Sequence, residues 1–114
     1  MLLIEYPKCS TCQKAKKYLL LKNIVFETRN IVEEKLNQKE LHRLIQKSGK
    51  DINNFFNTSG LKYRELKLKN KLQNMSYEEK LNILSTDGML VKRPLLELTD
   101  NVLIGFKEKE WNDI

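Results

Sequence analysis

Cys9 and Cys12 are the only cysteines in the chain, and two residues separate them. An apolar run, Leu2–Ile4, precedes this Cys-Ser-Thr-Cys motif, and a helical pattern, Gln13–Lys22, follows it. A thiol at the start of a helix faces unpaired N–H groups and the positive end of the helix dipole, and both favour an anion. Such a position lowers the pKa of a cysteine from about 8.5 to roughly 3.5–7.5. The motif therefore predicts a reactive thiolate.

The same spacing predicts a pair of thiols that can form a disulfide. Residues three apart on a helix lie about 5–6 Å apart between Cβ atoms, whereas a disulfide needs roughly 3.5–4.5 Å, so a small adjustment closes the bond. Cys9 is nearer the helix end, and we expect it to be the nucleophile and Cys12 to be the resolving thiol. Lys8 adds positive charge beside the motif, and we expect Ser10 or Thr11 to cap the helix.

The two cysteines allow three other interpretations. Zinc needs four ligands, and His42, which we interpret as a surface residue of a helix, is the only other soft ligand in the chain. A structural disulfide that closes so short a loop would stabilise the protein little. Two inert cysteines that only pack in the core are the remaining alternative. We predict thiol chemistry and no bound metal.

Length and composition limit the classes of protein. A chain of 114 residues has room for one domain with a real core, and we expect residues 1–114 to form that single domain. No apolar run approaches the ~20 residues of a membrane span, and the N-terminus shows no basic leader, so we expect a cytoplasmic protein. In that compartment a Cys-x-x-Cys motif beside a strand–helix–strand pattern indicates redox chemistry.

The charge balance says little about partners. The chain has 21 Lys and Arg against 15 Asp and Glu, which gives a net charge of +6. A basic surface permits an acidic partner or a nucleic acid. The lysines are nevertheless spread among glutamates, and no basic stripe is interleaved with aromatic residues. We therefore expect a solvated lysine-rich surface and no direct binding of nucleic acid.

Apolar periodicity and capping signals predict alternating strands and helices. The first strand, helix and second strand form a β-α-β unit short enough to require parallel strands and a right-handed crossover. Asn37–Glu40 and Ser76–Glu79 have the spacing of capping boxes, and Trp111 is interpreted as a packing residue. The expected strands are 2–6, 24–28, 95–98 and 102–106, and the expected helices are 11–22, 37–49, 76–88 and 107–112, with short helical pieces over 51–72.

This order of elements is the thioredoxin arrangement. It predicts an α/β fold with a mixed four-stranded sheet, built as β-α-β, a helical insertion and then β-β-α. Two strands are parallel, and a hairpin completes the sheet. In that architecture the loop before the hairpin faces the loop that carries the cysteines.

Three stretches resemble, in order and spacing, the arsenate reductase-related (ArsC/Spx) family: Tyr6–Ala15, Tyr63–Leu66 and Asp87–Leu95. The resemblance covers essentially the whole chain and implies a thioredoxin-like fold with a nucleophile at Cys9. It also implies a cis peptide bond at Pro94 and places Arg93 beside the sulfur. A guanidinium in that position would lower the pKa of the thiol and bind an oxyanion bidentately.

The chain departs from the arsenate reductases of this family in its arginines. Those enzymes hold the oxyanion with three arginines, whereas here only Arg93 remains, and Asn57 and Gly105 stand near the other two positions. Each lost charge-assisted bond is worth ~1.5–3 kcal/mol, so we expect weak or absent arsenate reduction. Those enzymes also generally lack a cysteine at the position of Cys12, which shifts our prediction toward thiol–disulfide exchange.

We therefore predict a thiol-based oxidoreductase that uses the Cys9–Cys12 couple and binds no cofactor. Its reducing equivalents would come from thioredoxin, glutaredoxin or a small thiol such as glutathione or bacillithiol. The alternative is a redox-sensing regulator. Spx-type members of the family use the same motif as a sensor and bind the C-terminal domain of the RNA polymerase α subunit. They place an arginine in the turn where this chain has Asn57–Gly60, so we rank this alternative second.

Overall fold

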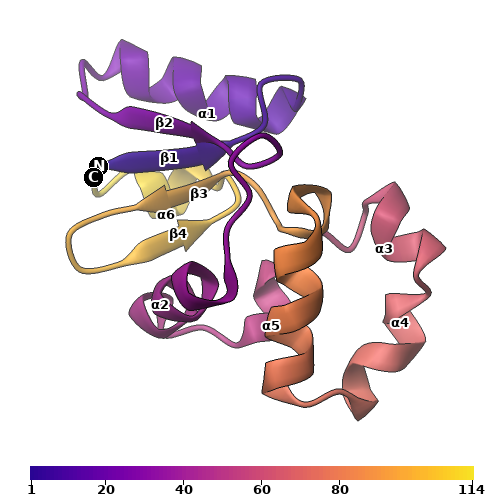
Figure 1. The fold of residues 1–114 in the computed structure, drawn as a ribbon. Coiled ribbons are helices and arrows are strands. Elements are labelled where there is room, and N and C mark those ends of the chain that lie inside the picture. Colours follow the sequence, from indigo (N-terminus) through magenta and orange to yellow (C-terminus); the bar gives the residue numbers. More distant parts are fainter.

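The computed structural model describes residues 1–114 and contains a mixed four-stranded sheet, seen at the left of Figure 1. The sheet order is β2-β1-β3-β4, with β1 parallel to β2, and with β3 antiparallel to both β1 and β4. The predicted mixed sheet and its β-α-β unit are therefore confirmed. The strands are β1 Leu2–Glu5, β2 Glu27–Asn30, β3 Leu95–Glu97 and β4 Val102–Ile104.

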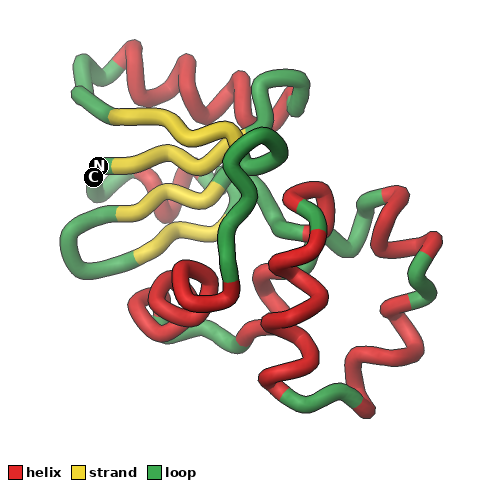
Figure 2. The backbone as a smooth tube through the Cα atoms, in the orientation of Figure 1, coloured by secondary structure: helices red, strands yellow, loops and turns green.

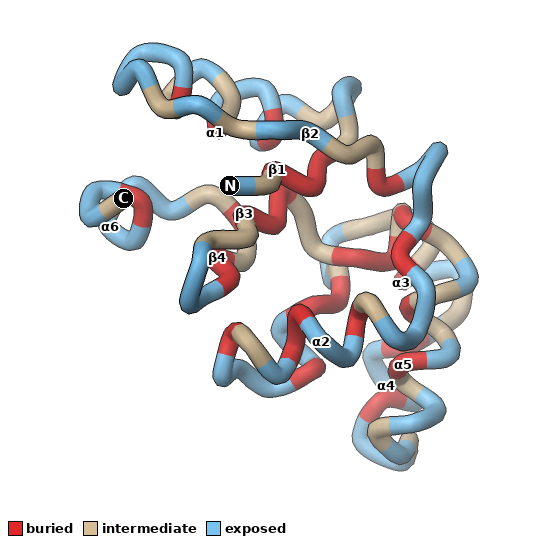
Figure 3. Tube along the Cα trace, turned by 60° about the vertical axis from the view of Figure 1, so that its left-hand side comes forward, coloured by how far each residue is buried: buried red, intermediate tan, exposed pale blue.

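Helices cover both faces of the sheet. On one face, α1 (Ser10–Leu21) and α6 (Glu108–Trp111) bury a small apolar cluster against the sheet. Trp111 is a fully buried member of that cluster, and this confirms the predicted packing role. The other face carries the larger core, which includes side chains from β1, β3 and β4. Buried positions lie on β1, β3 and β4, whereas the edge strand β2 has none (Figure 3).

The helical insertion between β2 and β3 covers this second face and extends beyond the sheet (Figure 2). Both predicted capping boxes are present, since Asn37 and Ser76 each accept a hydrogen bond from the N3 backbone N–H and receive the reciprocal bond from Glu40 or Glu79. The insertion consists of α2 Gln38–Ser48, η1 Ile52–Phe55, α3 Leu61–Glu65, α4 Leu68–Lys71, η2 Leu72–Asn74, α5 Tyr77–Thr86 and η3 Gly88–Leu90.

The second strand lies later in the chain than predicted. Ile24 and Phe26 pack against the α1 cluster from a loop, and Val25 is 92% exposed. The pairing with β1 is instead made by Glu27–Asn30, whose side chains are polar because β2 lies at the edge of the sheet. The apolar residues predicted the wrong position for this strand, because backbone pairing at the edge of a sheet does not require buried side chains.

The last strand is shorter than predicted because of one glycine. Gly105 has a φ of +74°, in the left-handed region that glycine adopts without steric cost. Its N–H still donates to the carbonyl oxygen of Pro94 at 2.8 Å in line with the β3–β4 ladder, but the left-handed backbone turns the chain away, and β4 ends at Ile104. No helix of the structure is both long and apolar enough to cross a membrane.

Candidate active site

Cys9 lies at the N-terminus of α1, directly after the loop that leaves β1. Its backbone is extended, with φ −83° and ψ 123°, so Cys9 itself is the N-cap residue. The prediction that Ser10 or Thr11 caps the helix was wrong, because both already lie within the first turn and no side chain makes a capping hydrogen bond. The first N–H groups of α1 are therefore free to bond the Cys9 sulfur once it is a thiolate.

The two thiols have opposite environments. Burial raises the pKa of Cys9, but the N–H of Cys12, the Cys12 thiol, the charge of Arg93 and the N–H of Thr11 together outweigh it, so the pKa of Cys9 lies below its usual value. Burial, supported by the neighbouring Cys9 thiolate, raises the pKa of Cys12 to about 12. Cys9 is partly exposed and Cys12 is fully buried, and neither is in a disulfide.

Arg93 is the cation of the site, and its guanidinium is held from two sides. It lies over the ring of Tyr6, with Cζ 5.5 Å from the ring centroid, a contact typical of cation–π pairs. One terminal nitrogen donates to the carbonyl oxygen of Met89 at 3.5 Å. The Nε atom is buried and has no hydrogen-bond partner. A fixed guanidinium with an unused N–H is suited to hold a thiolate or another anion.

The loop before β3 brings Arg93 to the cysteines. The Arg93–Pro94 peptide bond is cis, as the resemblance implied. Asn57 lies on the neighbouring turn, where its side chain donates to the Met89 carbonyl at 3.4 Å and its N–H donates to Leu90 at 2.8 Å. Asn57 and Arg93 therefore share one carbonyl acceptor, and an amide stands beside the guanidinium.

Gly105 offers no place for an arginine without rearrangement. A side chain there would have to adopt a positive φ, and its Cβ would lie 3.3 Å from Cε of Lys92. The structure thus agrees with the sequence in giving the site a single guanidinium, that of Arg93. Lys8, in contrast, is exposed and makes no ion pair. The charge that lowers the pKa of Cys9 comes from Arg93.

Two contacts of the site were not predicted from the sequence. Tyr6 was assigned only to the first strand, but its ring supports Arg93. Met89 contributes through its backbone carbonyl, which a sequence cannot single out because every residue carries one. His42 is exposed and hydrogen-bonds the Tyr77 hydroxyl at 2.7 Å, away from the cysteines. The structure gathers no cluster of three or more His, Cys, Asp or Glu residues that could hold a metal ion.

The sheet order, the helices on both its faces and the site at the start of α1 define a thioredoxin-like protein. The chain belongs to the ArsC family, whose sequence profile matches residues 4–114. It is 49% identical over 108 residues to YusI of Bacillus subtilis, an alignment that covers 95% of this chain and 92% of YusI.

Two further relatives bear on function. One is the crystal structure of an ArsC family related protein from Bacteroides fragilis, which shares 49% sequence identity with this chain and superposes on it with a TM-score of 0.95. The superposition covers 98% of this chain and 94% of the Bacteroides fragilis chain. The global transcriptional regulator Spx of Streptococcus mutans is 26% identical over 104 residues, which cover 91% of this chain and 74% of Spx. The family thus includes relatives close to this chain and more distant transcriptional regulators.

Proposed function

We propose that this protein is a thiol–disulfide oxidoreductase in which Cys9 and Cys12 form the redox couple. The observation that carries the proposal is the contrast between the two thiols: the pKa of Cys9 is lowered beside Arg93 and the start of α1, while burial raises that of its neighbour Cys12 to about 12. A partly exposed thiolate can attack a substrate disulfide, and a buried thiol one helical turn away can then attack the resulting mixed disulfide.

The reaction runs in two exchanges. The Cys9 thiolate attacks one sulfur of a substrate disulfide, which forms a mixed disulfide and releases the other substrate sulfur as a thiolate. Cys12 then loses its proton and attacks the Cys9 sulfur, which releases the second substrate thiolate and leaves the Cys9–Cys12 disulfide. Two electrons pass from the protein to the substrate. A dithiol protein such as thioredoxin or glutaredoxin, or two molecules of a small thiol, would return them.

The order of the two steps follows from the coupling between the thiols. While Cys9 is a thiolate, its charge and its hydrogen bond raise the pKa of Cys12, in addition to the effect of burial. A mixed disulfide at Cys9 removes that charge, so the pKa of Cys12 falls at the stage when its thiolate is needed. Arg93 remains in place to favour the new thiolate.

The proposed substrate is a disulfide rather than arsenate. With Asn57 and Gly105 near the positions where the arsenate reductases carry arginines, the site offers one guanidinium to an oxyanion. Each missing charge-assisted hydrogen bond forfeits ~1.5–3 kcal/mol of binding free energy. A disulfide sulfur carries no charge and does not need those arginines.

Trapping of the mixed disulfide tests the proposal. With glutathione disulfide as substrate, the Cys12→Ser variant should accumulate one glutathione on Cys9, because the resolving thiol is missing. The wild-type protein should pass through that adduct to the intramolecular disulfide, and Cys9→Ser should do neither at neutral pH. The adducts are counted by intact-protein mass spectrometry. A Cys9→Ser variant that exchanges as fast as the wild type would refute the assignment of the nucleophile.

A redox-sensing regulator is the second candidate, and the similarity to Spx of Streptococcus mutans supports it. A regulator of that type would bind the C-terminal domain of the RNA polymerase α subunit in only one redox state of the Cys9–Cys12 pair. The turn from Asn57 to Gly60 offers small neutral groups where Spx-type members place an arginine. We therefore rank catalysis above regulation. Binding that depends on the redox state would reverse that order.

A further inference from the structure

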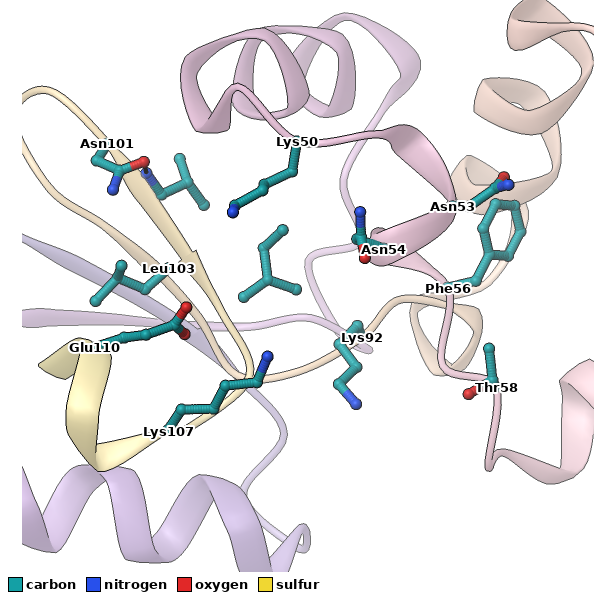
Figure 4. Close-up of a pocket in the computed structure, with 12 residues that line it drawn as sticks. Lys50, Asn53, Asn54, Phe56, Thr58, Lys92, Asn101, Leu103, Lys107 and Glu110 are labelled. Carbon is teal, nitrogen blue, oxygen red and sulfur yellow. Dashed lines mark hydrogen bonds between the residues drawn. The ribbon is translucent and has the colours of Figure 1, made fainter.

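The outer edge of β4 is open along a cavity of about 530 Å³, and neither cysteine lines it. The volume falls within the ~300–1,000 Å³ typical of ligand sites. Its floor includes all of β4, and its walls come from the segment after α2, from η1 and from the start of α6 (Figure 4). The cavity is therefore a groove that runs along the free edge of the sheet.

The strand in this groove has unused backbone groups. The Leu98 N–H donates to the carbonyl oxygen of Asn101, and the Gly105 N–H donates to the carbonyl oxygen of Pro94. Along residues 101–105, the backbone groups of the odd-numbered residues therefore point toward β3. By the alternation of antiparallel ladders, Val102 and Ile104 face outward. The Val102 N–H is taken by the Asn101 side chain at 2.8 Å. The N–H of Ile104 and the two outward carbonyls have no neighbouring strand.

The opposite edge of the sheet is protected. Every residue of β2 is polar, and the Arg29 side chain ties it to the following segment through bonds to the carbonyls of Glu34 and Lys35 and an ion pair with Glu40. Native proteins usually block sheet edges in such ways to prevent unwanted pairing. In contrast, β4 has the apolar sequence Val-Leu-Ile, and the groove leaves its outer edge uncovered.

The groove is positively charged. Lys50, Lys92 and Lys107 line it, and none of them makes an ion pair. Figure 4 shows the side chains of Lys50 and Lys107 extending toward the strand from opposite walls. The single acidic residue of the lining is Glu110. Two copies of such an edge would repel each other, so the charge disfavours a dimer formed through β4.

We propose that the β4 groove binds an extended, acidic polypeptide segment of a partner protein as an additional strand. The Val102 carbonyl and the N–H and carbonyl of Ile104 would pair with the segment, a mode in which main-chain bonds give affinity. Lys50 and Lys107 would pair with its carboxylates. Because Lys92 precedes Arg93 in the chain, a partner held here would lie next to the thiol site; this last consequence alone rests on the proposed function.

A labelled model peptide tests the groove by binding alone, so the result does not depend on thiol chemistry. The probe is a fluorescein-labelled octapeptide of alternating valine and glutamate. Fluorescence anisotropy should give a Kd below about 100 μM, a free energy of about −5.5 kcal/mol. Lys50→Glu combined with Lys107→Glu should weaken binding at least tenfold. Methylation of alternate peptide amides should do the same, because it removes the N–H groups that a strand needs.

The matched control is Lys39→Glu combined with Lys69→Glu. These two lysines are exposed, make no ion pair and lie outside the groove, and the substitution changes the net charge equally. An equal loss of affinity in the control would overturn the proposal and leave only general attraction to a basic protein. Unchanged binding of the methylated peptide, absence of binding at millimolar peptide, or tighter binding of an eight-residue oligothymidylate would overturn it as well.

Discussion

Cys9 and Cys12 lie three residues apart on one helix, yet their thiols differ in pKa because their surroundings differ. Cys9 is the N-cap of α1, where backbone N–H groups and the Arg93 charge stabilise its thiolate against the effect of burial. Cys12 is buried beneath the helix, and the thiolate beside it raises its pKa further. The lowered pKa of Cys9 favours its thiolate and the raised pKa of Cys12 favours its thiol, which is the division of roles that a two-step exchange requires.

Substitution of Arg93 tests this account of Cys9. Arg93→Gln removes the positive charge, so the pKa of Cys9 should rise and the pH at which iodoacetamide alkylation reaches half its maximal rate should move upward. Alkylation at pH 7 should then slow. Cys12 does not interfere, since it is fully buried and the reagent does not reach it in the folded protein. Arg93→Lys should retain part of the effect.

Arg64 provides the control for that measurement. It is exposed and makes no ion pair, so Arg64→Gln changes the net charge equally without touching the site. Its alkylation profile should match that of the wild-type protein. If Arg93→Gln also gave the wild-type profile, the helix N-terminus alone would account for the reactivity of Cys9.

At the level of elements, local sequence signals predicted the helices better than the edge strands. The capping boxes at Asn37 and Ser76 are local, since the residues that form them are three positions apart, and both are present. The position of β2 depends on backbone pairing with β1. That pairing joins residues 25 positions apart in the chain, as in Leu2 with Glu27, and leaves no apolar pattern in an exposed edge strand.

The Asn37 cap should contribute measurably to stability. Asn37→Ala removes the acceptor for the Glu40 N–H at 2.8 Å, and loss of such a cap costs ~0.5–2 kcal/mol. Urea denaturation should show that decrease in the free energy of unfolding. Asn53→Ala is the control, because the Asn53 side chain is exposed and makes no hydrogen bond; its effect should stay within about 0.5 kcal/mol. Equal losses in both variants would argue against a role for the cap.

At the level of the whole molecule, the site is an assembly of three distant segments. The start of α1, the turn at Asn57 and the loop at Arg93 meet only because β3 returns beside β1 in the sheet. The cysteine motif could be predicted from local spacing. The proximity of Arg93 was predicted only through the family resemblance, and the support from Tyr6 and Met89 required the fold.

The same sheet places two surfaces with different chemistry next to each other. Arg93 faces the thiol site, while the preceding residue, Lys92, lines the groove along β4. Neither the groove nor its charge could be predicted from the sequence, because Lys50, Lys92 and Lys107 lie on separate elements that come together only in the folded chain. The lysines are spread along the sequence, but the fold brings three of them together in this groove.

Redox titration of the Cys9–Cys12 couple tests the central claim most directly. The folded protein is equilibrated in a series of glutathione or dithiothreitol buffers, quenched in acid, unfolded and alkylated, and its free thiols are counted by mass spectrometry. We predict one reversible two-electron transition in which both thiols disappear together, with no intramolecular disulfide in Cys12→Ser. Two thiols that both remain free at the most oxidising ratio would contradict the account and favour inert packing cysteines.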